Sequence, residues 1–367
     1  MRMKMQLFEC SNCHQPVYFD NNYCTACQHI LGFDAKKMQM IALDRKEDEL
    51  VLTEPTSQAR YKFCQNQQYN VCNWVLSETD THDFCMACSL NRVIPNLSDL
   101  EYRQRWHKIE LAKHRLIYAL LRWKLPLENK IKNPDLGLAF DFKADPNSPN
   151  EPKVMTGHDN DLITLNIAEA DDVERAMARN NMDEVYRTLL GHFRHEVGHY
   201  YWDVLVDGTE FLEPCRALFG DERMDYQEAL DRHYHQGPPA DWMEHYISPY
   251  ATMHPWEDWA ETWAHYLHIV DVLETADSFG VQIRPKVVEG QDDHMMNLGV
   301  KQNPYYSQSF DEIYQAWLPV AFAMNSLNRS MGQEDFYPFV INLEVQNKLK
   351  FIHDLIQLTA QKSLIAA

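Results

Sequence analysis

Apolar residues recur every three or four positions in several stretches of the chain, and this spacing predicts helices. The clearest helical stretch covers residues 181–207, where Asn181 is a candidate N-cap and Gly208 a candidate stop signal. Because Ser98-Asp99-Leu100-Glu101 is a capping box, a second long helix is expected over residues 98–126. Further helices are expected over residues 256–273, 310–331 and 342–358.

Alternation of apolar and polar residues, which indicates half-buried strands, occurs between the first two long helices. It is clearest in residues 136–142 and 162–167, and a shorter strand is expected near residues 154–155. Residues 34–57 are rich in charge without a clear period, so we expect them to connect two cysteine clusters described below. The whole pattern predicts an α+β fold in which a mainly helical domain carries a small β-sheet.

The composition is that of an ordinary globular protein. The 367 residues are 45% apolar and 24% charged. No apolar run approaches the length of a membrane span, about 20 residues, and no apolar signal segment precedes the first cysteine. We therefore expect a cytoplasmic protein that does not interact with a membrane.

The net charge of −20 argues against a general affinity for nucleic-acid backbones. It would suit a basic or unfolded substrate, although charge alone does not choose between these. The helix predicted over residues 98–126 nevertheless has a basic face, which is typical of a solvated surface or of an internal partner for acidic groups; a nucleic-acid role is the less favoured alternative. The basic residues are Arg103, Arg105, Lys108, Lys113, Arg115 and Arg122.

Eight of the nine cysteines fall within the first 88 residues, in two clusters of four. Their paired spacing and odd total indicate thiolate metal sites rather than disulfides. The first cluster has the C-x2-C-x10-C-x2-C spacing of a zinc ribbon, in which zinc would supply most of the folding free energy. The second, C-x7-C-x12-C-x2-C, predicts a second ribbon, with His82 as a candidate substitute ligand. The clusters are Cys10, Cys13, Cys24 and Cys27, and Cys64, Cys72, Cys85 and Cys88.

The helix predicted over residues 181–207 contains the motif HExxH, formed by His195, Glu196 and His199. Histidines four residues apart project from one face of a helix, so both imidazoles can bind one Zn²⁺. The glutamate between them then lies beside the open coordination position. With 17 histidines in the chain, such a motif also arises by chance, so a third ligand and a suitable scaffold are required.

The candidate third ligand is Glu257. Six residues past His199, where one class of HExxH enzymes has its third histidine, stands Leu205, which cannot coordinate. On the helix predicted over residues 256–273, Glu257 and Glu261 share one face, while tryptophans cover another. We expect Glu257 to complete a catalytic-type zinc site and Glu261 to hydrogen-bond the free nitrogen of a ligand histidine. The alternative is that both carboxylates are exposed helix surface.

Three parts of the sequence together resemble the bacterial family of putative zinc-binding metallopeptidases that carry N-terminal zinc ribbons. These parts are the paired cysteine clusters and the runs GHFRHEVGHYYWD and HPWEDWAETWAHYLH. The resemblance implies a zincin-like domain over residues 135–363, preceded by ribbons over 1–33 and 58–95 and a linking helix over 98–126. In a zincin, an edge strand pairs with an extended peptide substrate. The resemblance does not identify that substrate.

The spacing from Glu257 to Glu261 is also similar to that of gluzincins such as the anthrax lethal factor protease. That similarity, confined to the motifs, implies that the first glutamate binds zinc and the second supports the site. It also implies that a tyrosine seven residues before the first glutamate assists catalysis, and Tyr250 occupies this position. On this interpretation Tyr250 stabilises the oxyanion, with Tyr246 and His254 as alternatives.

These observations predict a zinc metalloendopeptidase of the gluzincin type that binds three zinc ions, one catalytic and two structural. Zinc would polarise the peptide carbonyl and acidify a water, whose proton Glu196 would accept and pass to the leaving amine. We expect a protein or peptide substrate, with the ribbons recognising substrate or a protein partner, or only bracing the domain. The alternatives are a ribbon adaptor that binds without turnover, including one associated with nucleic acid, and a zinc amidase acting on a non-peptide substrate.

Overall fold

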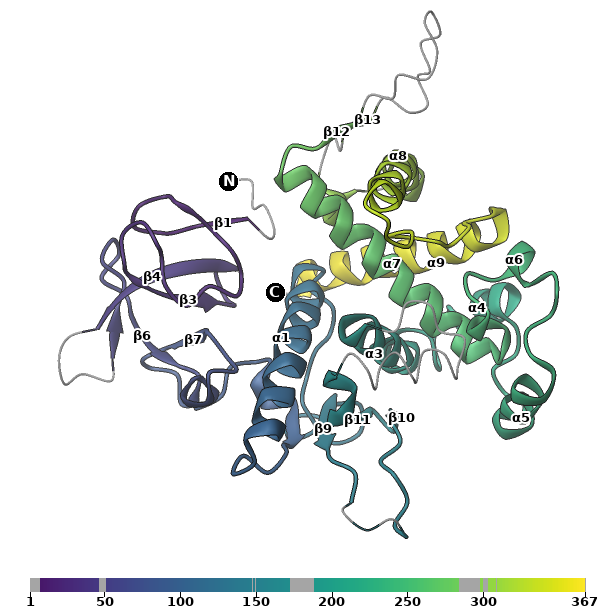
Figure 1. Cartoon of the computed structure of the whole chain (residues 1–367), viewed down its shortest axis with the longest axis horizontal. Helices are drawn as coiled ribbons and strands as arrows, with labels where there is room; N and C mark the ends of the chain where they lie inside the picture. The colour runs from purple at the N-terminus through teal and green to yellow at the C-terminus, as the bar shows by residue number, and fades with distance from the viewer. Residues whose placement is uncertain are drawn as a thin grey trace, which may run out of the picture. The chain divides into compact units, whose positions relative to one another are not determined.

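The computed structural model describes residues 7–45, 51–146, 148, 150–171, 188–283, 298–299, 303–307 and 309–366 (Figure 1). The chain divides into two compact units. The first comprises Met1–Leu121, Pro126–Ala178 and Thr188–Phe193, and the second Arg122–Leu125, Arg179–Arg187 and Arg194–Ala367. The predicted α+β class is confirmed, with strands concentrated in the first unit and helices in the second. The residue ranges predicted for the domains stay predictions.

The first unit begins with a short hairpin and a closed five-stranded barrel. The barrel closes where β3 pairs in parallel with β7, at Phe33 opposite Trp74. The expectation that residues 34–57 only connect the cysteine clusters was therefore wrong. Its run Met40-Ile41-Ala42-Leu43 is buried on every side, and such continuous apolar runs show no period of two. The strands are β1 (Phe8–Glu9), β2 (Pro16–Val17), β3 (Ile30–Asp34), β4 (Gln39–Arg45), β5 (Leu52–Thr53), β6 (Arg60–Phe63) and β7 (Trp74–Ser77).

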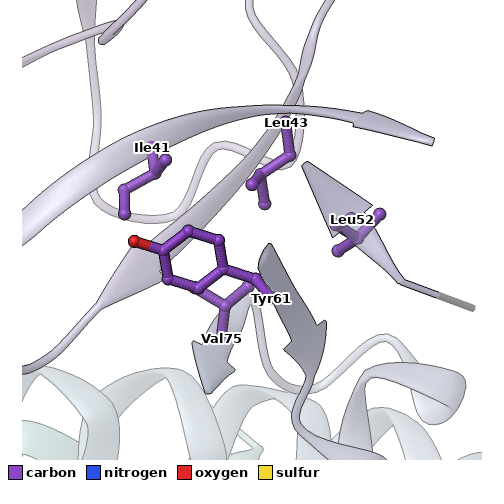
Figure 2. Close-up of a cluster of buried hydrophobic side chains, with 5 residues drawn as sticks. All are labelled: Ile41, Leu43, Leu52, Tyr61 and Val75. Atoms are coloured by element: carbon purple, nitrogen blue, oxygen red, sulfur yellow. The ribbon is translucent and has the colours of Figure 1, made fainter. Parts of the chain in front are cut away.

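Side chains from four of these strands form a hydrophobic cluster in the barrel (Figure 2). A Cβ on Gly32 of β3 would lie 2.5 Å from Cγ1 of Val75, so only glycine lets these two strands approach so closely. The ring of Tyr61 lies in the cluster, and its hydroxyl donates to Asp34 over 3.3 Å. The cluster consists of Ile41, Leu43, Leu52, Tyr61 and Val75.

Helix α1 (Leu100–Arg122) follows the barrel and the short elements η1 (Gln65–Tyr69) and η2 (Cys88–Leu90). Asp99, rather than the expected Ser98, caps it: Oδ1 of Asp99 accepts from the backbone N of Glu101 at 2.8 Å. Tyr118 of α1 packs against Phe8, Phe19 and Phe33, which joins the helix to the hairpin and the barrel.

The basic residues of α1 bind partners within the chain. Nη2 of Arg105 lies 2.6 Å from Oδ2 of Asp171, and Nζ of Lys113 lies 2.9 Å from Oε1 of Glu110. Arg103, Lys108, Arg115 and Arg122 likewise contact a carbonyl or a carboxylate. These contacts favour the interpretation of the basic face as an internal partner for acidic groups; the absence of a nucleic-acid partner stays a prediction.

A four-stranded sheet in the order β10-β11-β9-β8 completes the first unit. The strand predicted over residues 162–167 is present, whereas the one predicted near 154–155 was misplaced and lies at Gly157–Asp159. The turn between them has Asn160 and Asp161 at positive φ, a conformation that asparagine and aspartate tolerate. The elements are β8 (Asn91–Val93), β9 (Ala139–Lys143), β10 (Gly157–Asp159), β11 (Leu162–Asn166) and η3 (Ile167–Ala170).

Helix α7 is the centre of the second unit, where it packs against α4, α8, α9 and η4 (Figure 1). Its long buried surface explains why its sequence is rich in tryptophan and alanine. The HExxH helix begins later than expected, at Leu189, where Oγ1 of Thr188 accepts from the backbone N of Gly191 at 2.9 Å. Asn181, the expected cap, lies outside the described residues. The elements are α3 (Leu189–Leu205, whose first five residues belong to the first unit), α4 (Leu212–Phe219), α5 (Tyr226–Gln236), α6 (Trp242–His245), η4 (Tyr250–Thr252), α7 (Pro255–Ser278), β12 (Gln282–Ile283), β13 (Leu298–Gly299), η5 (Pro304–Tyr306), α8 (Phe310–Ser330) and α9 (Leu343–Ala366).

Buried ion pairs hold α7 in place within this unit. Arg122 pairs with Glu274 at 2.5 Å, and Lys348 of α9 pairs with Asp258 at 2.6 Å. Burial raises the pKa of Asp258 to about 7, even though Lys348 lowers it. Breaking such a pair would leave one charge buried and unpaired, so the pairs fix the register of the helices. Across the described residues, no helix combines the length and apolar character that crossing a membrane requires.

Candidate metal centre

The first cysteine tetrad lies in two matching turns of the N-terminal hairpin region. In each turn the backbone N of the residue four positions on, His14 or Gln28, donates to the carbonyl of Cys10 or Cys24 at 2.9 Å. The sulfurs of Cys10 and Cys27 lie 3.6 Å apart, as do those of Cys13 and Cys24. Four sulfurs held tetrahedrally at about 2.3 Å from zinc are about 3.8 Å apart, so this arrangement fits a structural zinc ion.

The second tetrad comes from both sides of β7 and is fully buried. The sulfurs of Cys72 and Cys85 lie 3.7 Å apart, and backbone N–H groups donate to three of the four sulfurs. The candidate ligand His82 is exposed and is not part of this group. Instead Nε2 of His114, on α1, lies 3.8 Å from Sγ of Cys88, a contact that spacing in the sequence did not indicate. Zinc binding is thus supported at two cysteine sites.

A close crossing of α3 and α7 brings the HExxH motif and Glu257 together. At the crossing, a Cβ on Gly198 would lie 3.0 Å from Cα of Ala260 and 3.2 Å from the side chain of Trp263. Nε1 of Trp259 also donates to the carbonyl of Gly198 at 2.8 Å. The glycine inside HExxH therefore sets the distance between the two helices and hence between their polar side chains.

The side chains of His195, His199 and Glu257 converge at this crossing, with their candidate ligand atoms all within 4.8 Å of one another. Nε2 of His195 lies 2.9 Å from Oε2 of Glu257, and Nε2 of His199 lies 3.5 Å from Oε1. Burial alone would raise the pKa of Glu257, but the two histidines lower it well below its usual range. The carboxyl group is consequently ionised at neutral pH.

The donor set fits a zinc ion. Nδ1 of His195 faces a carboxylate oxygen of Glu261 at 2.7 Å, which leaves Nε2 as the ring nitrogen that faces Glu257. Oε2 of Glu257 is buried and lies 2.9 Å from that nitrogen. A ring nitrogen and a carboxylate oxygen this close share either a proton or a metal ion. Two imidazoles and a carboxylate are zinc ligands.

Glu261 is hydrogen-bonded to Nδ1 of His195, and Ser248 is hydrogen-bonded to Glu261. Burial alone would lower the pKa of His195, but Glu257 and Glu261 raise it well above its usual range. The second oxygen of Glu261 accepts from Oγ of Ser248 at 2.7 Å, and that oxygen of Ser248 in turn accepts from the backbone N of Ala251 at 3.1 Å. A chain of hydrogen bonds therefore runs from His195 to the turn that carries Tyr250. Nothing in the sequence pattern pointed to Ser248.

Tyr226 and Tyr250 lie next to the candidate ligands, and the charge of Glu196 acts on Tyr226. Glu196 is buried, and the Tyr250 ring centroid is 5.9 Å from that of His195. Tyr226, which the sequence did not indicate, donates its hydroxyl to Oε1 of Glu257 at 2.9 Å. Burial and the charge of Glu257 raise the pKa of Tyr226 well above its usual range, Glu196 adds to the rise, and Tyr250 opposes it. The Tyr226 hydroxyl therefore stays protonated at neutral pH and can donate to Glu257.

The two alternatives to Tyr250 have other surroundings. His254 is the N-cap of α7: its Nδ1 accepts from the backbone N of Trp256 at 3.1 Å. Its Nε2 lies 3.1 Å from the carbonyl of Met224, so both ring nitrogens serve the backbone. Nζ of Lys348 lies over the ring of Tyr246, 4.5 Å from the ring centroid. These contacts favour Tyr250 over both residues.

Ser248→Ala should weaken zinc binding at this site about tenfold, because groups that orient a metal ligand typically contribute 10- to 100-fold to affinity. The measurement is competition with a chelator, followed at the most weakly held zinc. The matched control is Thr252→Val in the same turn, since the Thr252 hydroxyl donates to the backbone carbonyl of Pro249 at 2.7 Å. Equal affinities for Ser248→Ala and the wild type would contradict the proposed link to Glu261.

Comparison with known proteins agrees with this arrangement. A family model described as "Putative zinc-binding metallo-peptidase" matches residues 102–355, and a zinc-ribbon domain model matches residues 7–99. Uncharacterized proteins of Mycobacterium bovis and Mycobacterium tuberculosis are 39% identical over 354 residues, which cover 96% of this chain and 95% of each relative. No solved structure matches the chain. The chain belongs to the putative zinc-binding metallopeptidase family and carries that family's fold behind an N-terminal zinc-ribbon domain.

Proposed function

We propose that the protein is a zinc-dependent peptidase that hydrolyses peptide bonds of a protein or peptide substrate. The observation that carries the proposal is the convergence of His195, His199 and Glu257 within 4.8 Å, a donor set and geometry that fit a zinc ion. Glu261, 2.7 Å from Nδ1 of His195, gives the ligand the carboxylate partner that metal-binding histidines usually have. When bound, zinc would polarise the substrate carbonyl and acidify a water molecule.

The chain's own residues then supply the proton transfers. Glu196, between the two histidines on α3, accepts the proton of the attacking water and passes it to the nitrogen of the leaving amine as the C–N bond breaks. Tyr250 stabilises the negative charge that develops on the carbonyl oxygen. The Tyr250 ring lies 5.9 Å from that of His195, and Glu196 is not one of the three converging ligands.

The N-terminal ribbons are proposed to recognise the substrate or a protein partner. Aromatic side chains project from the first ribbon, where Tyr18 and Tyr23 are each 57% exposed. Phe84 and Met86 are likewise exposed on either side of the buried Cys85. Exposed apolar groups held on a rigid zinc-bound turn are typical of recognition surfaces.

Metal stoichiometry by elemental analysis tests the proposal first. We expect three zinc ions per chain in the wild type and two in the His199→Ala, Glu257→Ala double variant, because both cysteine tetrads remain intact. A screen with peptides and with small amides then separates a peptidase from an amidase. Two zinc ions in both proteins, under conditions without chelator, would contradict the proposal and favour a ribbon adaptor that binds without turnover.

A further inference from the structure

The first turn of α5 reaches the candidate metal centre through a single side chain. The hydroxyl of Tyr226 donates to Oε1 of Glu257 at 2.9 Å, while the other oxygen of Glu257 faces Nε2 of His195 at 2.9 Å. The carboxylate is thus held at both ends by different groups. A hydrogen bond to one oxygen of a ligand carboxylate restricts its rotation, and here it keeps Oε1 near His199 and Oε2 near His195.

Two features fix the position of Tyr226: the N-cap of α5 and the contact of its ring with His254. Asp225 caps α5, with Oδ1 accepting from the backbone N of Glu228 at 2.8 Å, so Tyr226 is the first residue of the helix. The Tyr226 ring lies 5.3 Å from the ring of His254. His254 in turn caps α7 and contacts the Met224 carbonyl, so the starts of α5 and α7 are joined. Because Glu257 lies in the first turn of α7, Tyr226 and Glu257 are fixed relative to each other.

We propose that Tyr226 is a positioning residue of the metal centre, which holds the Glu257 carboxylate oriented for zinc; this rests on the metal site of the proposed function. Of the eleven residues of α5, Ala229 is the only buried one, so the helix has little apolar anchoring of its own. The bond from Tyr226 to Glu257 therefore also anchors α5 beside the centre. A tyrosine that served only to pack would need its ring against His254 but not its hydroxyl.

Tyr226→Phe separates these two roles, because it keeps the ring and removes only the hydroxyl. We expect it to weaken zinc binding at the third site by about 10- to 100-fold, measured by competition with a chelator while the two tetrads stay loaded. The kcat should fall more than KM rises, because the substituted site is mispositioned rather than blocked. The matched control is Tyr234→Phe, on the same helix and 55% exposed, which should change neither quantity.

Two outcomes would overturn the proposal. One is a zinc affinity within twofold of the wild type for Tyr226→Phe; the other is an equal loss for Tyr234→Phe, which would indicate a general effect on α5. A double variant isolates the contact: in a Glu257→Ala background, which has no acceptor for the hydroxyl, Tyr226→Phe should cause no further loss of zinc affinity. Since zinc affinity is measured without a substrate, a wild type that binds three zinc ions but hydrolyses nothing would overturn the proposed activity and leave this inference standing.

Discussion

Glu196→Gln should lower peptide hydrolysis by about 10²- to 10⁴-fold, the contribution typical of a positioned general base, while the protein still binds three zinc ions. The amide is isosteric with the carboxyl group but cannot accept the proton of the attacking water at neutral pH. Glu196 does not belong to the converging donor set of His195, His199 and Glu257, so metal binding should be unaffected. The measurements are steady-state kinetics on a cleaved peptide and zinc content of the same preparation.

The matched control for this substitution is Glu210→Gln, which removes the same charge from an exposed position after α3. It should leave both hydrolysis and zinc content unchanged. Full turnover in Glu196→Gln would exclude Glu196 as the base. A loss of zinc together with activity would instead show that the residue acts on the metal site rather than on the proton.

Cys72→Ser should remove the zinc ion of the second tetrad and lower the free energy of unfolding of the first unit by several kcal/mol. Zinc binding contributes about 10–16 kcal/mol to the folding of isolated zinc fingers. Loss of one thiolate ligand would remove a large part of this free energy. Cys64 and Cys72 flank the stretch between β6 and β7, two strands of the barrel. We therefore expect loss of this zinc to expose β6 and β7 to hydrogen exchange.

Cys215→Ser is the control for the loss of a buried thiol. Cys215 is buried in α4 and, in the part of the chain that the structure describes, belongs to no group of converging ligands. It should keep three zinc ions and lose at most about 1–3 kcal/mol of stability, the range for an ordinary buried substitution. Equal losses of zinc or stability in the two variants would argue against a structural zinc at the second tetrad.

The parts of the site that the sequence predicted are those encoded locally. The spacing of His195 and His199 fixes their common face through the helical repeat alone, and the same repeat relates Glu257 to Glu261. The structure brings these side chains together, and their roles as ligands stay predictions. Three pairs of cysteines in the two tetrads are separated by two residues, and this local spacing allowed the metal-binding turns to be predicted from the sequence.

The parts that the sequence could not predict depend on contacts between distant segments. Tyr226 meets Glu257 across 31 residues and Ser248 meets Glu261 across 13, and neither residue belongs to a recognisable motif. The barrel was missed because β5 has only two residues, and because the run of β4 is apolar without alternation. The register of the strands and the closure of the barrel depend on which strands pair with each other. The pattern of residues along one strand does not specify its partner.

Closure of the barrel has a consequence for the order of folding. The four thiols of the first tetrad span residues 10–27, so their zinc site can form as soon as this short segment has been synthesised. The barrel closes only when β7 pairs with β3, about 40 residues further along the chain at Phe33 and Trp74. Pairing of distant segments is slow because the entropy of loop closure must be overcome first. We therefore expect the first ribbon to be a metal-bound nucleus on the ribosome, well before the barrel and the second tetrad assemble around it.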